Sequence, residues 1–185
     1  MSDQDPDSKL IERVGRGEPA ATRVLVTAKL PRILGLATRM LRDTAEAEDV
    51  AQEAFVRIWR NAGAWQPGRA RFDTWLHMVV LNLCRDRLRR RRESVSDAAP
   101  EPLDPTPDAE AGLIEAERER TVADAITALP ERQREAILLV HYQDLSGADA
   151  ACALDISVEA LESLLARGRR TLRARLAQAQ EATDA

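Results

Sequence analysis

The densest group of side chains with evident chemistry is a tract of arginines. Six of the eight residues from Arg85 to Arg92 are arginine, and Asp86 is the one acid among them. Guanidinium groups form bidentate hydrogen bonds with phosphate and with the base edge of guanine. Because like charges at this density repel one another, the tract indicates a polyanion such as nucleic acid as its partner. A basic helix end that is merely solvated is the alternative.

The net charge of the chain hides this local excess of base. The 185 residues carry a formal net charge of −4, with 27 basic and 31 acidic side chains. Acid is concentrated in the N-terminal tail and in a middle stretch, whereas base is concentrated at 85–92 and 167–175. Such separation is compatible with nucleic-acid binding whatever the sum. Lys9 and Lys29 are the only lysines, and a GC-rich genome would produce the same bias toward arginine.

No set of residues has the spacing of a catalytic or metal site. His77 and His141 lie far apart in sequence, without a neighbouring cysteine or a ligand-spaced acid, so we expect hydrogen-bonded or exposed histidines. Cys84 and Cys152 lie in different halves on apolar segments, which predicts buried free thiols, with redox sensing as the alternative. We therefore expect no enzymatic activity, no metal and no cofactor. The chain would act by recognition.

Two amphipathic helices between Asp43 and Glu93, joined by a polar loop rich in Gly and Pro, are expected to position the arginine tract. Apolar residues recur at a spacing of three and four, which places them on one face of each helix. In the first helix these are Val50, Ala51, Ala54, Phe55 and Ile58. In the second they are Trp75, Leu76, Val79, Val80 and Leu83.

The sequence predicts an all-α first domain over residues 9–92, behind a frayed tail at 1–8. Aromatic residues make up only 3% of the chain, which favours packed helices over a sheet. A short helix is expected to end at Gly15-Arg16-Gly17, and Pro19 suits the first turn of the next. Pro31 is expected to interrupt or restart that helix, giving four or five helices in all. Asp43-Thr44 is the predicted cap of the following helix.

Residues 93–112 are predicted to be a flexible linker, because prolines there alternate with acids and almost nothing is apolar. A plain spacer is the simplest reading, and an acidic shield for the neighbouring arginines is the alternative. The second domain, 113–185, contains a predicted helix-turn-helix. Its helices run from Ser146 to Leu154 and from Ser157, as the cap, to about Gln178, around a tight turn at Asp155-Ile156.

The second of these helices would enter the major groove of DNA. Its inward side is predicted to comprise Val158, Leu161, Leu165, Leu172 and Leu176. Its outward side would be the reading surface and comprises Glu159, Ala160, Ser163, Arg167 and Arg170.

Two stretches carry a family resemblance. The first is DVAQEAFVRIW from Asp49 to Trp59, followed by FDTWL from Phe72 to Leu76 and by Asn82 and the arginines. The second is ALPERQRE from Ala128 to Glu135, with Ile156-Ser157-Val158 and RGRRTLR from Arg167 to Arg173. They resemble regions 2 and 4 of bacterial RNA polymerase sigma factors of the extracytoplasmic-function (ECF) type, in the right order, with only a linker between them.

The resemblance implies a subunit that gives RNA polymerase its promoter specificity. It implies docking on the clamp helices of the largest polymerase subunit by Asp49, Gln52, Glu53 and Arg57. It implies contact with the −10 promoter element, including capture of a flipped base, by Gln66, Arg69, Arg71, Asn82, Arg85, Arg87, Arg89 and Arg90. It implies reading of the −35 element by Ser157, Glu159, Ala160, Ser163, Arg167 and Arg170. An anti-sigma factor, clamped between the two domains, is the further partner implied.

The sequence departs from the family at the expected reading surface. Ala160, Glu162 and Leu164 stand where a threonine and two basic residues are expected, and Asp155 stands where glycine is usual in the turn. Weaker or altered −35 reading is therefore expected. Two alternatives remain open: a sigma mimic that sequesters an anti-sigma protein without binding DNA, and a helix-turn-helix repressor. With no hydrophobic N-terminal segment and no long apolar run, the sequence predicts a cytoplasmic protein without membrane insertion.

Overall fold

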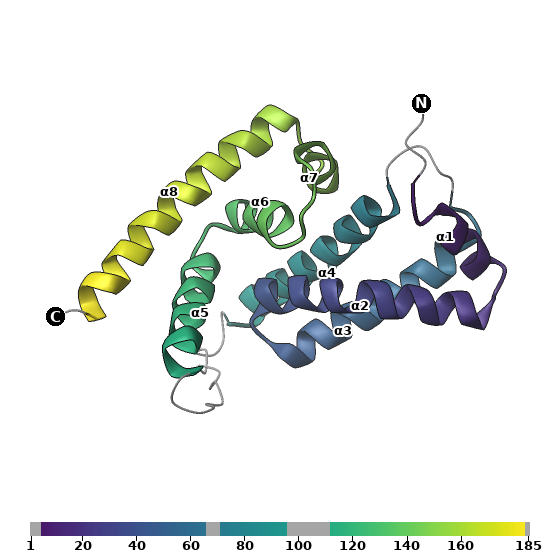
Figure 1. Cartoon of the computed structure of the whole chain (residues 1–185), viewed down its shortest axis with the longest axis horizontal. Coiled ribbons are helices and arrows are strands. Elements are labelled where there is room, and N and C mark those ends of the chain that lie inside the picture. The colour runs from purple at the N-terminus through teal and green to yellow at the C-terminus, as the bar shows by residue number, and fades with distance from the viewer. Residues whose placement is uncertain (1–4, 66–70, 96–111, 184–185) are drawn as a thin grey trace.

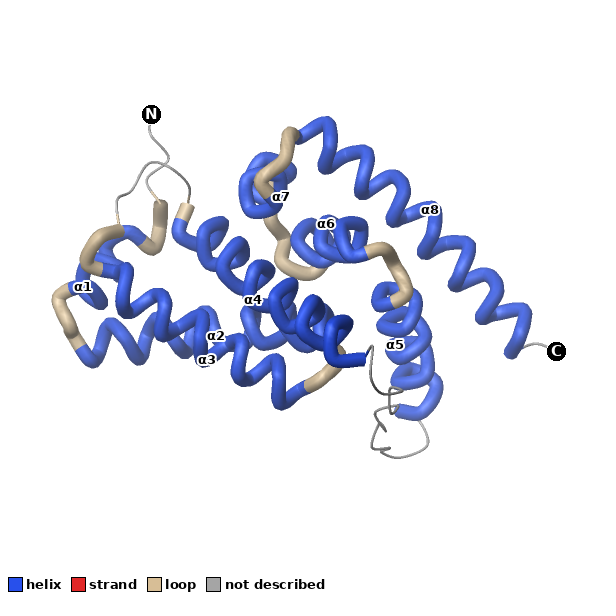
Figure 2. Tube along the Cα trace, turned by 180° about the vertical axis from the view of Figure 1, so that it is seen from behind, coloured by secondary structure: helices blue, strands red, loops and turns tan. Residues whose placement is uncertain are grey.

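The computed structural model describes residues 5–65, 71–95 and 112–183, and every regular element in these ranges is a helix (Figure 2). The first four are α1 (Ser8–Gly15), α2 (Pro19–Leu41), α3 (Thr44–Ala62) and α4 (Phe72–Val95). The other four are α5 (Gly112–Thr127), α6 (Glu131–His141), α7 (Gly147–Leu154) and α8 (Val158–Thr183). The prediction of an all-α fold with two helical domains is confirmed. The bulk of the predicted linker, 96–111, lies outside the described residues.

Helices α1 to α4 form a bundle (Figure 1), and the apolar faces predicted from sequence spacing make up its interior. All five residues of the predicted α3 stripe are buried, with Ile58 at 0% exposure. On α4, Leu76 and Val80 are buried in the same interior, whereas Trp75 is half-buried. Asp43 caps α3 as predicted, because its carboxylate accepts a hydrogen bond of 3.0 Å from the backbone N–H of Glu46.

The prediction that Pro31 breaks the second helix is wrong. Helix α2 runs without interruption through Pro31. Proline cannot donate the hydrogen bond that a helix expects at its position. Pro31 lies on the exposed side, while Ile33 and Leu36 are buried at 1% and 0% exposure. Burial of the apolar face therefore outweighs the missing bond, and the first bundle has four helices among the residues described.

In the second half, α8 is a long helix along one side of the molecule, with α6 and α7 between it and the first bundle (Figure 1). Gly168 allows the close approach of α8 to α6, since a Cβ atom there would lie 3.1 Å from Cγ1 of Ile137. The predicted turn is present: Asp155 adopts the left-handed conformation with φ of 55°, and Ser157 caps α8 through the N–H of Ala160 at 3.2 Å. Helix α8 extends past the predicted end at Gln178 to Thr183.

The two halves pack directly against each other, with α4 in contact with α7 and α2 in contact with α5 and α6. The hydroxyl of Thr74 on α4 donates a hydrogen bond of 3.1 Å to Asp149 on α7. Nε2 of His77 lies 3.2 Å from the side-chain oxygen of Gln143, and the amide of Gln143 donates at 3.3 Å to the carbonyl of Arg32. Buried apolar side chains from both halves form one continuous cluster.

We predict that the Leu25→Ala variant lowers the free energy of unfolding by about 2–5 kcal/mol, because it leaves a cavity in a tightly packed interior. Leu25 has 0% exposure, whereas its neighbour Val24 is 56% exposed. The matched variant Val24→Ala should change the free energy of unfolding by no more than about 0.5 kcal/mol. Urea denaturation followed by circular dichroism measures both. Equal losses in the two variants would contradict the burial pattern of α2.

Candidate nucleic-acid and polymerase interface

The structure divides the arginine tract of α4 into side chains with different surroundings. Arg91 faces the corner between α2 and α3, where it donates to the carbonyl of Leu41 at 3.2 Å and pairs with Glu46 at 2.9 Å. Arg89 and Arg90 point to solvent, and Arg89 pairs within its own helix with Asp86 at 3.0 Å. Helix α4 therefore carries arginines that stabilise the bundle and arginines that are available to a ligand.

Arg85, at the start of the tract, is paired with the second half of the chain. Its guanidinium donates to both oxygens of Glu135 on α6, at 2.5 and 2.9 Å. Arg132 reaches the same carboxylate at 3.3 Å. The hydrogen bonds to Glu135 raise the pKa of Arg85. Nη1 of Arg85 donates to the side-chain oxygen of the exposed Asn82 at 2.9 Å, so these two predicted −10 residues form one connected group.

The predicted polymerase-binding residues line a groove between α3 and α4 with a volume of about 450 Å³. The same groove includes residues of the arginine tract. Its lining comprises Asp49, Gln52, Glu53, Val56, Arg57, Leu83, Asp86, Arg87 and Arg90. Arg87 pairs across it with Asp49 at 3.3 Å, and Arg57 pairs with Glu53 at 3.1 Å along α3. The structure thus brings two sets of residues, predicted for different partners, onto one surface.

Of the loop predicted to hold a flipped base, Gln66 and Arg69 lie outside the described residues, and Arg71 is exposed at the entry to α4. The ends of the loop rest on an aromatic cluster. Trp65 packs edge-on against Phe72 at 5.6 Å between ring centroids and lies 5.5 Å from Trp75.

The structure also places the N-terminal segment against the start of α4, which the sequence did not indicate. The carboxylate of Asp5 accepts a hydrogen bond of 2.5 Å from the backbone N–H of Phe72. Asp7 pairs at 2.5 Å with Lys29, which pairs in turn with Asp73 at 2.7 Å. These contacts join residues that lie far apart in the first half of the sequence, so local sequence spacing gives no signal for them.

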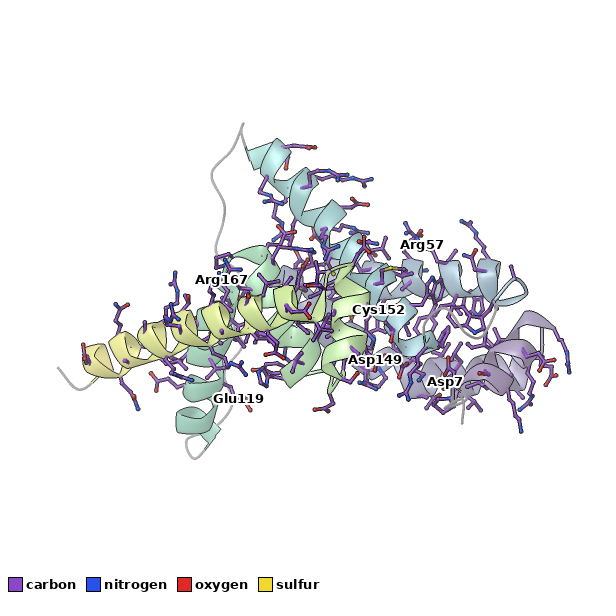
Figure 3. The ribbon with its side chains drawn as sticks, turned by 90° about the horizontal axis from the view of Figure 1, so that it is seen from above. Asp7, Arg57, Glu119, Asp149, Cys152 and Arg167 are labelled. Carbon is purple, nitrogen blue, oxygen red and sulfur yellow. The ribbon has the colours of Figure 1, made fainter. Side chains whose placement is uncertain are left out.

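The predicted −35 surface lies on α8, away from α3 (Figure 3). Its outward residues Glu159, Ala160, Ser163, Arg167 and Arg170 are all exposed. Hydrogen bonds with its own backbone and with Ser157 lower the pKa of Glu159. Val158 was predicted to point inward, but it is 45% exposed. The buried face of α8 begins at Leu161 and continues to Leu165, which are 0% and 3% exposed.

Comparison with known proteins identifies the family of this chain. Residues 25–94 match the family Sigma-70 region 2, and residues 119–172 match Sigma-70, region 4. The RNA polymerase sigma-H factor of Pseudomonas aeruginosa is 34% identical over 183 residues, covering 93% of this chain and 94% of the relative. The ECF RNA polymerase sigma factor SigW of Bacillus subtilis is 31% identical over 183 residues, covering 91% and 95%. The chain belongs to the ECF family of sigma factors.

Solved structures share the fold of this ECF sigma factor. CnrH, solved in complex with the cytosolic domain of CnrY, has a TM-score of 0.72 and 27% identity, covering 93% of this chain and 97% of CnrH. The sigma factor RpoE of Bartonella quintana, solved with the anti-sigma factor NepR, has a TM-score of 0.67 and 21% identity, covering 83% and 95%. The likeness to RpoE is one of fold.

The histidines and cysteines of the sigma factor are structural or exposed. His77 is 2% exposed, its Nδ1 lies 2.6 Å from the carbonyl of Asp73, and burial lowers its pKa. His141 is exposed, so the prediction for both histidines is confirmed. Cys84 is buried as predicted, but Cys152 is exposed on α7, which corrects its assignment (Figure 3). The apolar neighbours of Cys152 in sequence, Ala151 and Ala153, take the buried face of this short helix.

Across the described parts of the chain, no group of His, Cys, Asp and Glu side chains is arranged to hold a metal ion. In the same ranges, no helix combines the length and apolar character needed to cross a membrane.

We predict that one thiol of the native sigma factor reacts with an aromatic disulfide reagent at pH 8. Burial raises the pKa of Cys84 to about 12, so its nucleophilic thiolate is scarce and inaccessible, while Cys152 is exposed. The Cys152→Ser variant should show no fast reaction. Unfolding the wild-type protein in urea should make one further thiol, that of Cys84, reactive. Fast reaction of the Cys152→Ser variant without denaturant would contradict the burial of Cys84.

Proposed function

We propose that this ECF sigma factor binds core RNA polymerase through α3 and directs initiation at promoters with −10 and −35 elements. The observation that carries the proposal is the shared groove between α3 and α4. There the predicted docking residues of α3 stand beside Arg87 and Arg90 of α4. Polymerase docked on α3 would hold the arginine face of α4 close to the DNA. A repressor with a helix-turn-helix has no need of such a groove.

In this proposal the chain is divided as its sequence indicates. Residues 9–92 form the domain for polymerase and the −10 element, residues 93–112 the linker, and residues 113–185 the domain for the −35 element. Arg87, Arg89 and Arg90 neutralise phosphates, which contributes affinity but little sequence information. The amide of Asn82, exposed beside Arg85, contacts a base edge, and the loop at 65–71 holds an unpaired base.

The α8 surface supports −35 binding that relies on the backbone more than on base edges. Arg167 and Arg170 are exposed and suit phosphate contacts. Glu159 and Glu162 are also exposed, and their negative charge near the DNA groove would repel phosphate. The exposed Val158 adds an apolar contact of the kind that a thymine methyl group accepts. The mixture of basic, acidic and apolar side chains on this face of α8 also favours a second candidate function, a sigma mimic that binds an anti-sigma factor without binding DNA.

An anti-sigma factor is the expected regulator. CnrH and RpoE, which share the fold, were each solved with a protein partner. Here a groove of about 480 Å³ between α2 and α5 has apolar lining residues from the second half, including Val122, Ile126 and Tyr142, while α2 contributes Thr38 and Arg39. A partner helix of matching apolar character would fit this groove and hold the two halves together.

We predict that the double variant Gln52→Ala and Glu53→Ala weakens association with core polymerase by about tenfold or more, as loss of central interface contacts does. Fluorescence anisotropy of the labelled sigma factor titrated with core polymerase measures this. The control Glu12→Ala removes an exposed, ion-paired acid from α1 and should bind normally. Wild-type protein that binds core but starts no transcript on genomic promoters would indicate the mimic, and failure to bind core would overturn the proposal.

We predict that replacing Arg87, Arg89 and Arg90 with alanine weakens promoter binding by the holoenzyme and flattens its salt dependence. Each lost phosphate contact should reduce the slope of log K against log salt by about 0.7–0.9. A matched control replaces the exposed Arg13 on α1, Arg16 directly after it and Arg23 on α2, which carry the same total charge. Binding is measured by filter retention over a series of salt concentrations. An unchanged slope in the first variant would show that the tract does not face phosphate.

A further inference from the structure

The segment before α1 lies outside the part of the chain that matches the sigma family, yet it contacts α4. The match to Sigma-70 region 2 begins at residue 25, whereas the first residue that the structure describes is Asp5. Figure 1 shows this segment beside the start of α4. Helix α1 keeps it there, because Ile11 and Val14 are buried in the bundle at 1% and 5% exposure. The apolar interior of the bundle therefore fixes the position of the segment.

The carboxylate of Asp5 binds two backbone groups at once. One oxygen accepts a hydrogen bond of 2.5 Å from the N–H of Phe72, and the other accepts one of 3.0 Å from the N–H of Asp7. Phe72 is the first residue of α4, so its N–H has no partner within the helix. The side chain of Arg71, directly before it, has donors only and cannot cap the helix. Asp5 therefore caps α4 from a position 67 residues away.

A buried lysine fastens the same segment. Lys29 on α2 pairs with Asp7 at 2.5 Å and with Asp73, the second residue of α4, at 2.7 Å. The side chain of Lys29 is only 11% exposed, and an ammonium group with so little access to water needs carboxylates beside it. The start of α4 is thus held at two successive residues, through the backbone of Phe72 and through the side chain of Asp73.

Holding the N–H of Phe72 also fixes the backbone of Arg71. A peptide group is planar, so the N–H of Phe72 and the carbonyl of Arg71 turn together. That carbonyl accepts a hydrogen bond of 3.1 Å from the N–H of Trp75, which closes the first turn of α4. Arg71 is exposed and is one of the residues assigned to the −10 element. Asp5 and Trp75 together therefore determine the direction in which the side chain of Arg71 leaves the backbone.

We propose that Asp5 is a positioning residue for Arg71 in promoter recognition. It sets the peptide group between Arg71 and Phe72 and thereby directs the guanidinium of Arg71 toward the DNA of the −10 element. Asp5 itself does not contact DNA, because backbone donors occupy both of its oxygens. The positioning role rests on the proposed function, which assigns Arg71 to that element. Loss of Asp5 should therefore weaken −10 binding only while Arg71 is present.

A double-mutant cycle tests this dependence. Holoenzymes that carry the wild-type sigma factor, Asp5→Ala, Arg71→Ala or both substitutions are titrated with a promoter fragment whose −10 strand is unpaired. The fragment comes from a promoter on which the wild-type holoenzyme starts transcription. Asp5→Ala alone should weaken binding by about fivefold, the scale of a lost helix cap. The double variant should bind as Arg71→Ala alone does.

Two results of the cycle would overturn the positioning role. The first is unchanged binding by Asp5→Ala. The second is a loss on Asp5→Ala that persists at full size in the Arg71→Ala background, because a general structural effect of Asp5 does not depend on Arg71. If Arg71→Ala binds as tightly as wild type, the assignment of Arg71 to the −10 element falls together with the positioning role. If the wild-type protein does not join core polymerase, the proposed function itself falls.

Two further variants separate the hydrogen bond from the charge. Asp5→Asn keeps an acceptor for the N–H of Phe72 and should bind the fragment within about twofold of wild type, since Asn and Asp are equally good caps. Glu117→Ala removes the same charge as Asp5→Ala from an exposed site on α5 and should bind normally. Binding by Asp5→Asn as weak as that of Asp5→Ala, or an equal loss in Glu117→Ala, would contradict a role through the hydrogen bond to Phe72.

Discussion

The burial of one carboxylate, that of Glu135, determines how the two halves of this sigma factor meet. A charge with no exposed surface has to be compensated inside the protein, and Arg85 and Arg132 provide that compensation from two different helices. Because Arg85 belongs to α4 and Glu135 to α6, the pair fixes the position of one half on the other. The contacts of His77 with Gln143 and of Thr74 with Asp149 follow from that placement. A buried ion pair, a few polar contacts and apolar packing thus fix the register of the interface together.

Helix α4 shows how one residue type acquires different roles within a few residues. Successive positions on a helix differ in direction by about 100°, so a run of arginines points all the way around it. Arg91 turns toward Glu46 and the carbonyl of Leu41 and stabilises the bundle. Arg89 and Arg90 turn to solvent, and Arg85 and Arg92 turn toward α6. The charge density that indicates a polyanion in the sequence is therefore partly neutralised within the protein.

The features predicted from sequence are those set by local physics. The apolar spacing of α3, the caps at Asp43 and Ser157, and the left-handed Asp155 each depend on a few adjacent residues. The errors arise where packing against segments distant in the sequence determines the conformation or exposure of a residue. Pro31 is tolerated because packing on both sides of it holds α2 together, and Val158 and Cys152 are exposed because of what the neighbouring helices do not cover. The contact of Asp5 with Phe72 and the Arg85–Glu135 pair join residues 67 and 50 positions apart, which no local pattern encodes.

The internal partners of the arginine tract place a limit on how α4 contacts DNA. Arg85 is held by Glu135 and Arg87 by Asp49, whereas Arg90 is exposed. Asn82 belongs to the same connected group, because its amide oxygen accepts a hydrogen bond from Arg85. A base edge or a phosphate that contacts Arg85 or the amide oxygen of Asn82 must therefore replace an existing hydrogen bond, and the net free energy of that contact is reduced by the bond that is lost. The exposed arginines contribute phosphate affinity without such an exchange, so affinity and base reading on this helix depend on different side chains.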